Sequence, residues 1–149
     1  MNSIEQMVEA LTAKNLKLGF ESMEALEHIS EQTDHAARFL TNYFELLVHP
    51  NSYVRTRGLV LIAANAKWDK NNIIDQNIED FLAHIQDEKP ITARKCISVL
   101  PELAKQKPRL KGKIVLGLKS ANPPDLYADS MWPLVVKDIE TALQQINDA

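Results

Sequence analysis

Apolar residues recur at intervals of three and four along almost the whole chain, and no stretch of useful length alternates apolar with polar residues. Spacings of three and four place apolar side chains on one face of an α-helix, whereas strict alternation is typical of a β-strand. Residues 59–64 are apolar on every side, which is typical of a helix buried in the middle of a domain. The pattern therefore predicts an all-α fold without strands.

Eight helices are expected, and most of them begin at a residue suited to a helix start. Ser3 with Gln6 fits a capping box, and Pro90 and Pro108 suit a first helical position. Pro101 falls inside the sixth helix, where it removes a backbone donor and predicts a kink. The expected starts are Ser3, Asn15, Thr33 or Asp34, Ser52, the residue after Asn72, Pro90, Pro108 and Ser130.

The second expected helix contains a glycine in its first turn. Its expected apolar stripe contains Leu16, Phe20, Met23 and Leu26. Gly19 interrupts the first turn, where glycine costs about 1 kcal/mol relative to alanine.

The chain resembles itself when it is shifted by 37 residues. The shift places Val54 on Ile91 and Arg57 on Arg94, and it continues to match apolar residues in both directions as far as residue 110. Repeats of this length are typical of helical solenoids, whose terminal repeats differ because they cap the stack.

The segment from His49 to Gly58, with the sequence His-Pro-Asn-Ser-Tyr-Val-Arg-Thr-Arg-Gly, resembles the turn between the helices of a HEAT repeat. In such a repeat an Asp-Pro-type turn precedes Val-Arg at the start of the second helix. The second copy has Ile91-Thr92 in place of Val54-Arg55 and so lacks the arginine. The whole chain is also similar to small bacterial HEAT-like proteins, some of which are labelled SufBD-type iron–sulfur assembly proteins.

This resemblance implies a right-handed, HEAT-like α-solenoid of about four antiparallel helix pairs, in a single domain spanning residues 1–149. It implies a scaffold and does not specify a ligand. Cluster chemistry is not supported by the sequence, because iron–sulfur clusters require several thiolates and Cys96 is the only cysteine.

The net charge of −3 conceals an uneven distribution. Basic residues outnumber acidic residues by thirteen to seven in residues 51–119, whereas acidic residues lead by eight to three before this segment and by five to one after it. No stretch approaches the ~18–20 apolar residues that cross a membrane. The amino terminus lacks the basic start and apolar core of a signal peptide, so a cytoplasmic protein without a membrane partner is expected.

The sequence contains no recognisable catalytic pattern. Gly-Xaa-Ser-Xaa-Gly, a phosphate-binding glycine loop and His-Glu-Xaa-Xaa-His are all missing. Cys96 lies in an apolar stripe and is expected to be structural. Glu24, His28 and Glu31 share a helical face, but a solvated acidic face is favoured because no cysteine or second histidine joins them. We expect no enzyme, no metal and no cofactor.

Equivalent positions of the repeat suggest a surface for a partner protein. Arg57 and Arg94 should project side by side, and helical spacing places Trp68 on the side of Arg57. Exposed arginine and tryptophan residues often dominate binding energy. The alternative is that Trp68 belongs to the core and that both arginines pair with nearby carboxylates. The candidate residues are Arg55, Arg57, Trp68, Lys70, Arg94 and Lys95.

A run of basic residues provides a second candidate surface, for an anionic partner. No acidic residue interrupts residues 103–124. HEAT-like repeats also form DNA-alkylation glycosylases, which bind the backbone of duplex DNA. The sequence does not identify a catalytic aspartate of that kind, and the nearest candidate is Asp69. The candidate cations are Lys105, Lys107, Arg109, Lys111 and Lys113.

Together these features favour a non-enzymatic scaffold that presents a concave helical face to another protein. The alternative is a nucleic-acid-binding HEAT-like module. A solvated basic surface is favoured over nucleic-acid binding, because the chain is acidic overall and aromatic residues do not interleave with the cations.

Overall fold

The all-α prediction is confirmed. The computed structural model describes residues 3–125 and 127–148, and these residues form helices and no strand. Ser3 and Gln6 make the expected capping box, and the side chain of Asn15 accepts a hydrogen bond from the Leu18 amide at the start of the second helix. Local capping chemistry therefore sets these helix starts.

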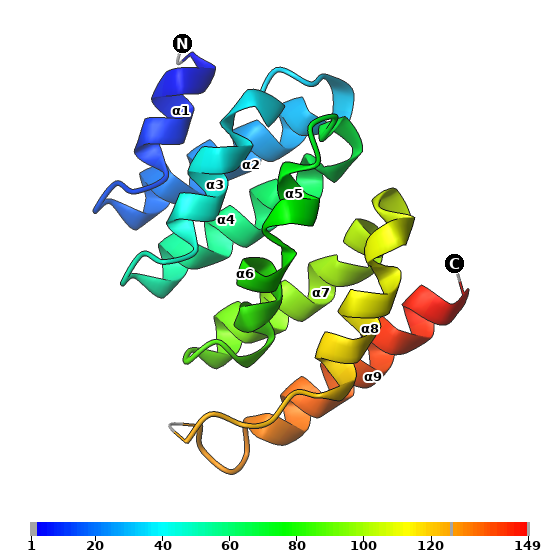
Figure 1. Cartoon of the computed structure of the whole chain (residues 1–149). Coiled ribbons are helices and arrows are strands. Elements are labelled where there is room, and N and C mark those ends of the chain that lie inside the picture. Colours follow the sequence, from blue (N-terminus) through cyan, green and yellow to red (C-terminus); the bar gives the residue numbers. More distant parts are fainter. Residues whose placement is uncertain (1–2, 126, 149) are drawn as a thin grey trace. The chain divides into compact units, whose positions relative to one another are not determined.

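The chain forms two compact units, Met1–Gln76 and Asn77–Ala149. In the first unit, α4 packs against both α2 and α3 (Figure 1). Residues 59–63 of α4 are all buried, as their apolar run predicts. The elements of this unit are α1 (Ile4–Ala10), α2 (Leu16–Gln32), a 3₁₀ turn (Ala37–Phe39), α3 (Leu40–Leu46), α4 (Ser52–Ala64), a 3₁₀ turn (Ala66–Trp68) and α5 (Ile73–Gln76).

In the second unit, α7 packs against α9 and α8 (Figure 1). The core between them contains Ile97 and Leu100 of α7, Ile114 of α8, and Val135 and Ile139 of α9. The elements of this unit are α6 (Ile78–Leu82), a 3₁₀ turn (Ala83–Gln86), α7 (Pro90–Gln106), a 3₁₀ turn (Pro108–Leu110), α8 (Lys111–Lys119) and α9 (Trp132–Asp148).

Several boundaries differ from the sequence prediction. The helix expected after Asn72 is divided at Asn77, and α4 is capped by the side chain of Asn51 instead of Ser52. The last helix begins beyond Ser130, at Trp132. Pro101, in contrast, lies inside α7 as predicted, and the helix continues through it.

The predicted buried face of α2 is wrong in its first turns. Phe20 is 50% exposed and Leu16 is similarly accessible, whereas Gly19, Met23 and Leu26 are buried. The helix is therefore rotated so that Gly19 faces the interior. On this face the side chain of Arg57 occupies the space beside Gly19.

Candidate functional site

Arg57 is a buried structural residue, which contradicts its predicted place on an exposed binding face. It is 4% exposed, and its guanidinium donates hydrogen bonds to the Leu11 carbonyl at 2.7 Å and the Leu16 carbonyl at 3.3 Å. Burial lowers the pKa of this guanidinium. The side chain therefore satisfies backbone carbonyls at the α1–α2 junction and does not present its charge to a partner.

Gly19 is required by this arrangement. An added Cβ at Gly19 would lie 2.3 Å from Nη1 of Arg57 and 2.4 Å from Cζ, far inside van der Waals contact. The glycine interrupts the apolar stripe because it makes room for the guanidinium.

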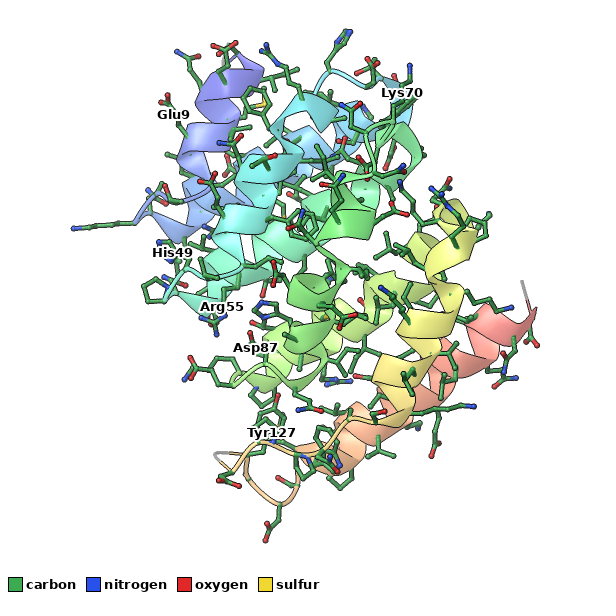
Figure 2. The ribbon with its side chains drawn as sticks, viewed as in Figure 1. Glu9, His49, Arg55, Lys70, Asp87 and Tyr127 are labelled. Atoms are coloured by element: carbon green, nitrogen blue, oxygen red, sulfur yellow. The ribbon has the colours of Figure 1, made fainter. Side chains whose placement is uncertain are left out.

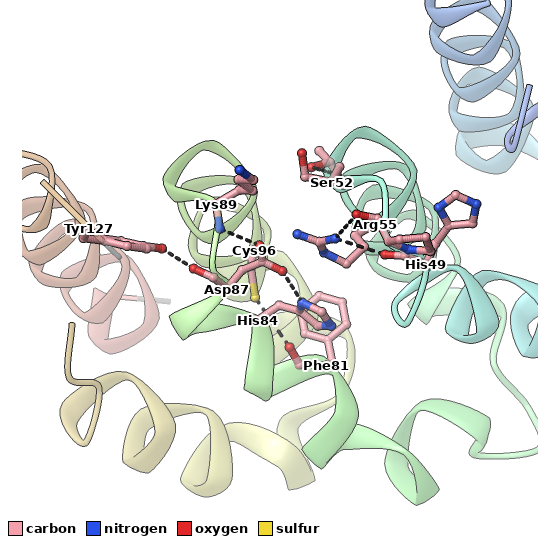
Figure 3. A network of polar contacts seen from close by, with 11 residues as sticks. His49, Ser52, Arg55, Phe81, His84, Asp87, Lys89, Cys96 and Tyr127 are labelled. Carbon is pink, nitrogen blue, oxygen red and sulfur yellow. Dashed lines mark hydrogen bonds and ion pairs between the residues drawn. The ribbon is translucent and has the colours of Figure 1, made fainter. Parts of the chain in front are cut away.

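Arg55 is also buried, so its predicted exposure is wrong. Its Nη1 donates to the carbonyls of His49 and Pro50, both at 3.0 Å (Figure 3). The side chain reaches back from the first turns of α4 to the turn that precedes the helix. Arg55 therefore stabilises the turn that precedes its own helix.

Trp68 is partly buried, and its indole Nε1 donates to the Ser30 carbonyl at 2.7 Å. The cation beside its ring is Lys67, whose Nζ lies 5.4 Å from the ring centroid. Arg57, the cation predicted to accompany Trp68, is instead bonded to the α1–α2 junction. Lys70 is exposed at the surface of the first unit (Figure 2).

Arg94 and Lys95 are exposed and line a cleft of about 430 Å³ between α7 and α9. We call this cleft the α7–α9 groove. Ile91, at the start of α7, lies on its rim and is 74% exposed. The groove is lined by Ile91, Arg94, Lys95 and Ser98 from α7 and by Asp138, Thr141, Ala142 and Gln145 from α9.

An ion pair crosses the groove. Arg94 Nε lies 2.6 Å from Asp138 Oδ2, and Nη2 lies 3.4 Å from Oδ1. The hydrogen bond and the charge of Asp138 raise the pKa of Arg94. The alternative expectation, that Arg94 pairs with a carboxylate, therefore holds. The partner is not from a neighbouring turn, however, because Asp138 lies on another helix, 44 positions away.

The predicted basic patch is divided between different surfaces of the second unit. Lys105 and Lys111 line one hollow of about 220 Å³, whereas Lys113 lines another beside Leu116. Lys111 and Lys113 are two residues apart on one helix, so their side chains leave it roughly 200° apart.

The remaining two candidates of the basic run differ in exposure. Arg109 is exposed, but Lys107 is only 8% exposed, which contradicts its predicted place on an accessible patch. Lys107 lies at the C-terminal end of α7, where its backbone amide donates to the Leu103 carbonyl at 2.8 Å.

A buried polar cluster around Asp87 was not predicted (Figure 3). The Asp87 side chain is 3% exposed; Oδ1 lies 2.7 Å from His84 Nδ1, and Oδ2 accepts from the Lys89 amide at 2.9 Å. The Tyr127 hydroxyl donates to the Asp87 carbonyl. The cluster therefore joins the α6–α7 turn to the connection between α8 and α9.

The Asp87 cluster lacks an activated nucleophile. Cys96 is fully buried, and its Sγ donates to the Phe81 carbonyl at 3.6 Å instead of bonding His84. Burial, followed by the charge of Asp87, raises the pKa of this thiol well above its ordinary value. Cys96 is therefore a structural thiol, as its sequence position predicts.

Other candidate chemical groups also have structural partners. The two carboxylate oxygens of Asp69 accept from the amides of Ile73 and Ile74, so this residue caps α5. His28 Nδ1 lies 3.8 Å from Glu31 on the surface of α2. Among residues 3–125 and 127–148, no three His, Cys, Asp or Glu side chains are arranged to hold a metal ion.

A helix that crosses a membrane must be both long and strongly apolar. Within the part of the chain that the structure describes, no helix combines the length and apolar character needed to cross a membrane.

No family model matches the sequence, and no curated protein matches it. Among solved structures, the chain is similar to the crystal structure of an engineered protein determined by a structural genomics consortium. The two share 16% sequence identity with a TM-score of 0.56, over 99% of this chain and 68% of the other. At this identity the similarity concerns the fold alone.

Proposed function

We propose that the chain is a cytoplasmic, non-enzymatic HEAT-like scaffold of about four helix pairs, which binds another protein through the α7–α9 groove. The self-similarity at 37 residues and the HEAT-like turn before α4 support the repeat. The observation that carries the binding role is the groove, where exposed Arg94, Lys95 and Ile91 lie together.

A binding role fits the chemistry of these side chains better than catalysis does. Arginine is enriched at protein interfaces, and an exposed aliphatic side chain at the rim adds apolar area to be buried. The candidate groups for catalysis are engaged elsewhere, since Cys96 is buried and the carboxylate of Asp69 caps α5.

Obstruction of the groove tests this proposal. Thr141→Trp would fill it from α9, whereas Gln144→Trp places the same side chain on an exposed position of α9 outside the lining. Each tagged variant is used for affinity capture from native lysate after nuclease treatment. We expect a defined protein to be retained by the wild type and by Gln144→Trp and to be lost with Thr141→Trp. Equal retention by all three proteins would contradict the role of the groove.

Nucleic-acid binding is the alternative, and it is supported by one hollow that Lys105 and Lys111 line together. Neutralised phosphates would give a slope of about −0.9 per phosphate in a plot of log affinity against log salt concentration. Lys105→Gln with Lys111→Gln would then flatten that slope. We expect no detectable binding of duplex DNA at ~50 mM salt, a condition that favours even non-specific contact. Salt-dependent binding that these substitutions abolish would favour the alternative.

A further inference from the structure

The α7–α9 groove already contains a carboxylate bound to its arginine. Asp138 presents Oδ2 to Arg94 Nε at 2.6 Å and turns Oδ1 toward Nη2 at 3.4 Å. Arginine commonly recognises carboxylates through two such parallel contacts. The Asp138 side chain therefore marks a place in the groove where a carboxylate is bound.

Exchange of this carboxylate for another one requires little free energy. The Arg94 and Asp138 side chains are 43% and 27% exposed, so water screens the pair. Ion pairs at such exposure typically shift an equilibrium by no more than about fivefold. Arg94 can therefore release Asp138 to an incoming anionic group without a large loss of stability.

The rest of the lining indicates which anionic group fits. Lys95 has no carboxylate within ion-pair distance among the residues that the structure describes, and Ile91 adds an exposed apolar side chain. The lining thus carries two positive charges and one negative charge. It contains no aromatic side chain on which a nucleobase could stack. Carboxylates next to an apolar side chain complement this surface better than a nucleic acid does.

We propose that the α7–α9 groove binds an acidic, partly apolar segment of a partner protein, and that Asp138 competes with the carboxylate of this segment for Arg94. The inference rests on the proposed scaffold function, because it names the chemistry of the partner at the same site. In the free protein Arg94 binds Asp138. In the complex Arg94 binds a carboxylate of the partner instead of Asp138.

The test uses the blocked peptide acetyl-Glu-Glu-Leu-Glu-Glu-amide and its counterpart with glutamine in place of every glutamate. Titration of the full chain is followed by NMR, through the Nε–H signal of Arg94 and the backbone amides of α7 and α9. Three variants are compared with the wild type: Asp138→Asn, Arg94→Gln and Glu140→Gln. Glu140 is exposed on α9 outside the groove lining, so Glu140→Gln removes the same charge without freeing Arg94.

We expect the glutamate peptide, and not the glutamine peptide, to shift the Arg94 Nε–H signal. Asp138→Asn should tighten binding about two- to fivefold, which is the factor that an exposed ion pair supplies. Glu140→Gln should change the affinity much less. Arg94→Gln should weaken binding by up to about fivefold, while its NMR spectrum remains that of a folded protein.

Equal tightening by Asp138→Asn and Glu140→Gln would overturn the proposed competition, because total charge would then explain the effect. Equal binding of both peptides, no binding of either, or stronger shifts with a single-stranded oligonucleotide would overturn the proposed ligand. These outcomes are separate from the capture experiment, which can still reveal a non-acidic partner at the groove.

Discussion

Arg57 and Gly19 depend on each other, because the guanidinium occupies the position that a Cβ at Gly19 would need. Gly19→Ala should displace Arg57 from the Leu11 and Leu16 carbonyls. Loss of hydrogen bonds from the buried guanidinium costs about 2–3 kcal/mol, whereas alanine in a helix gains about 0.5–1 kcal/mol over glycine. We therefore expect the free energy of unfolding to fall by about 1–2 kcal/mol. Urea denaturation followed by circular dichroism measures this change.

A helical glycine in open surroundings, Gly112, provides the matched control. Nothing lies within 4 Å of a Cβ added at Gly112 in α8, so Gly112→Ala should stabilise the protein by about 0.5–1 kcal/mol. In an Arg57→Ala background the clash is removed, and Gly19→Ala should become neutral or stabilising. If Gly19→Ala keeps its full effect in that background, Arg57 is not the cause of the glycine requirement.

Tyr127 makes the stability of the protein depend on alkaline pH. Burial, followed by the charge of Asp87, raises the pKa of Tyr127 from 10.0 to about 12. Between these values the unfolded chain releases the phenolic proton while the folded chain retains it. The stabilising contribution is therefore complete below pH 10 and is lost as the pH rises toward 12.

Tyr127→Phe should lower stability at pH 8 by about 1 kcal/mol, because the hydrogen bond to the Asp87 carbonyl is lost. It should also make the decline in stability above pH 10 shallower. Part of the decline should remain, since burial raises the pKa of Tyr43 as well. Urea denaturation series at pH 8, 10 and 11 measure both effects. A decline as steep as that of the wild type would show that Tyr127 does not titrate differently in the folded and unfolded chains.

Among the helices, α7 contains a proline in its interior, Pro101. It lies inside α7 and leaves the Ile97 carbonyl without its usual backbone donor. Proline in a helix interior destabilises the folded state by about 3 kcal/mol relative to alanine. Proline also restricts the unfolded chain, which offsets about 0.4–1 kcal/mol of this destabilisation. Pro101→Ala should therefore raise the free energy of unfolding by about 2 kcal/mol.

Pro90 supplies the control for this change within the same helix. It occupies the first helical position, where the missing amide is not needed. Pro90→Ala should not stabilise the protein. Thermal unfolding of both variants makes the comparison, and a loss of stability in Pro101→Ala would show that α7 has adapted its packing to the proline ring.

Over the whole molecule, the features that the sequence predicted correctly are those set by residues close together in the chain. The capping box at Ser3, the cap at Asn15, the first-turn position of Pro90 and the burial of residues 59–63 all follow from local pattern and were confirmed. The face of α2 was not predicted, because Gly19 meets a guanidinium from a helix about forty residues away.

The features of the candidate site likewise divide into those that the local sequence indicated and those that depend on contacts distant in the chain. The exposure of Arg94 and Lys95 follows from their positions opposite the apolar stripe of α7, and it was predicted. The Arg94–Asp138 ion pair and the Asp87–Tyr127 contact each join segments about forty residues apart, so no periodicity indicates them. The repeat also suggested that Arg57 and Arg94 are equivalent, but Arg57 is buried by contacts that the Arg94 position lacks.

Site-specific photo-crosslinking can detect a partner protein bound in the α7–α9 groove. A photo-reactive phenylalanine derivative is placed at Gln145, which lines the groove, or at Gln144, which is exposed on the same helix outside it. We expect a discrete crosslinked protein from position 145. The same product should be much weaker from position 144 and should disappear when Thr141→Trp fills the groove. Crosslinks of equal strength from both positions, or a product from position 145 that persists with Thr141→Trp, would contradict binding in the groove.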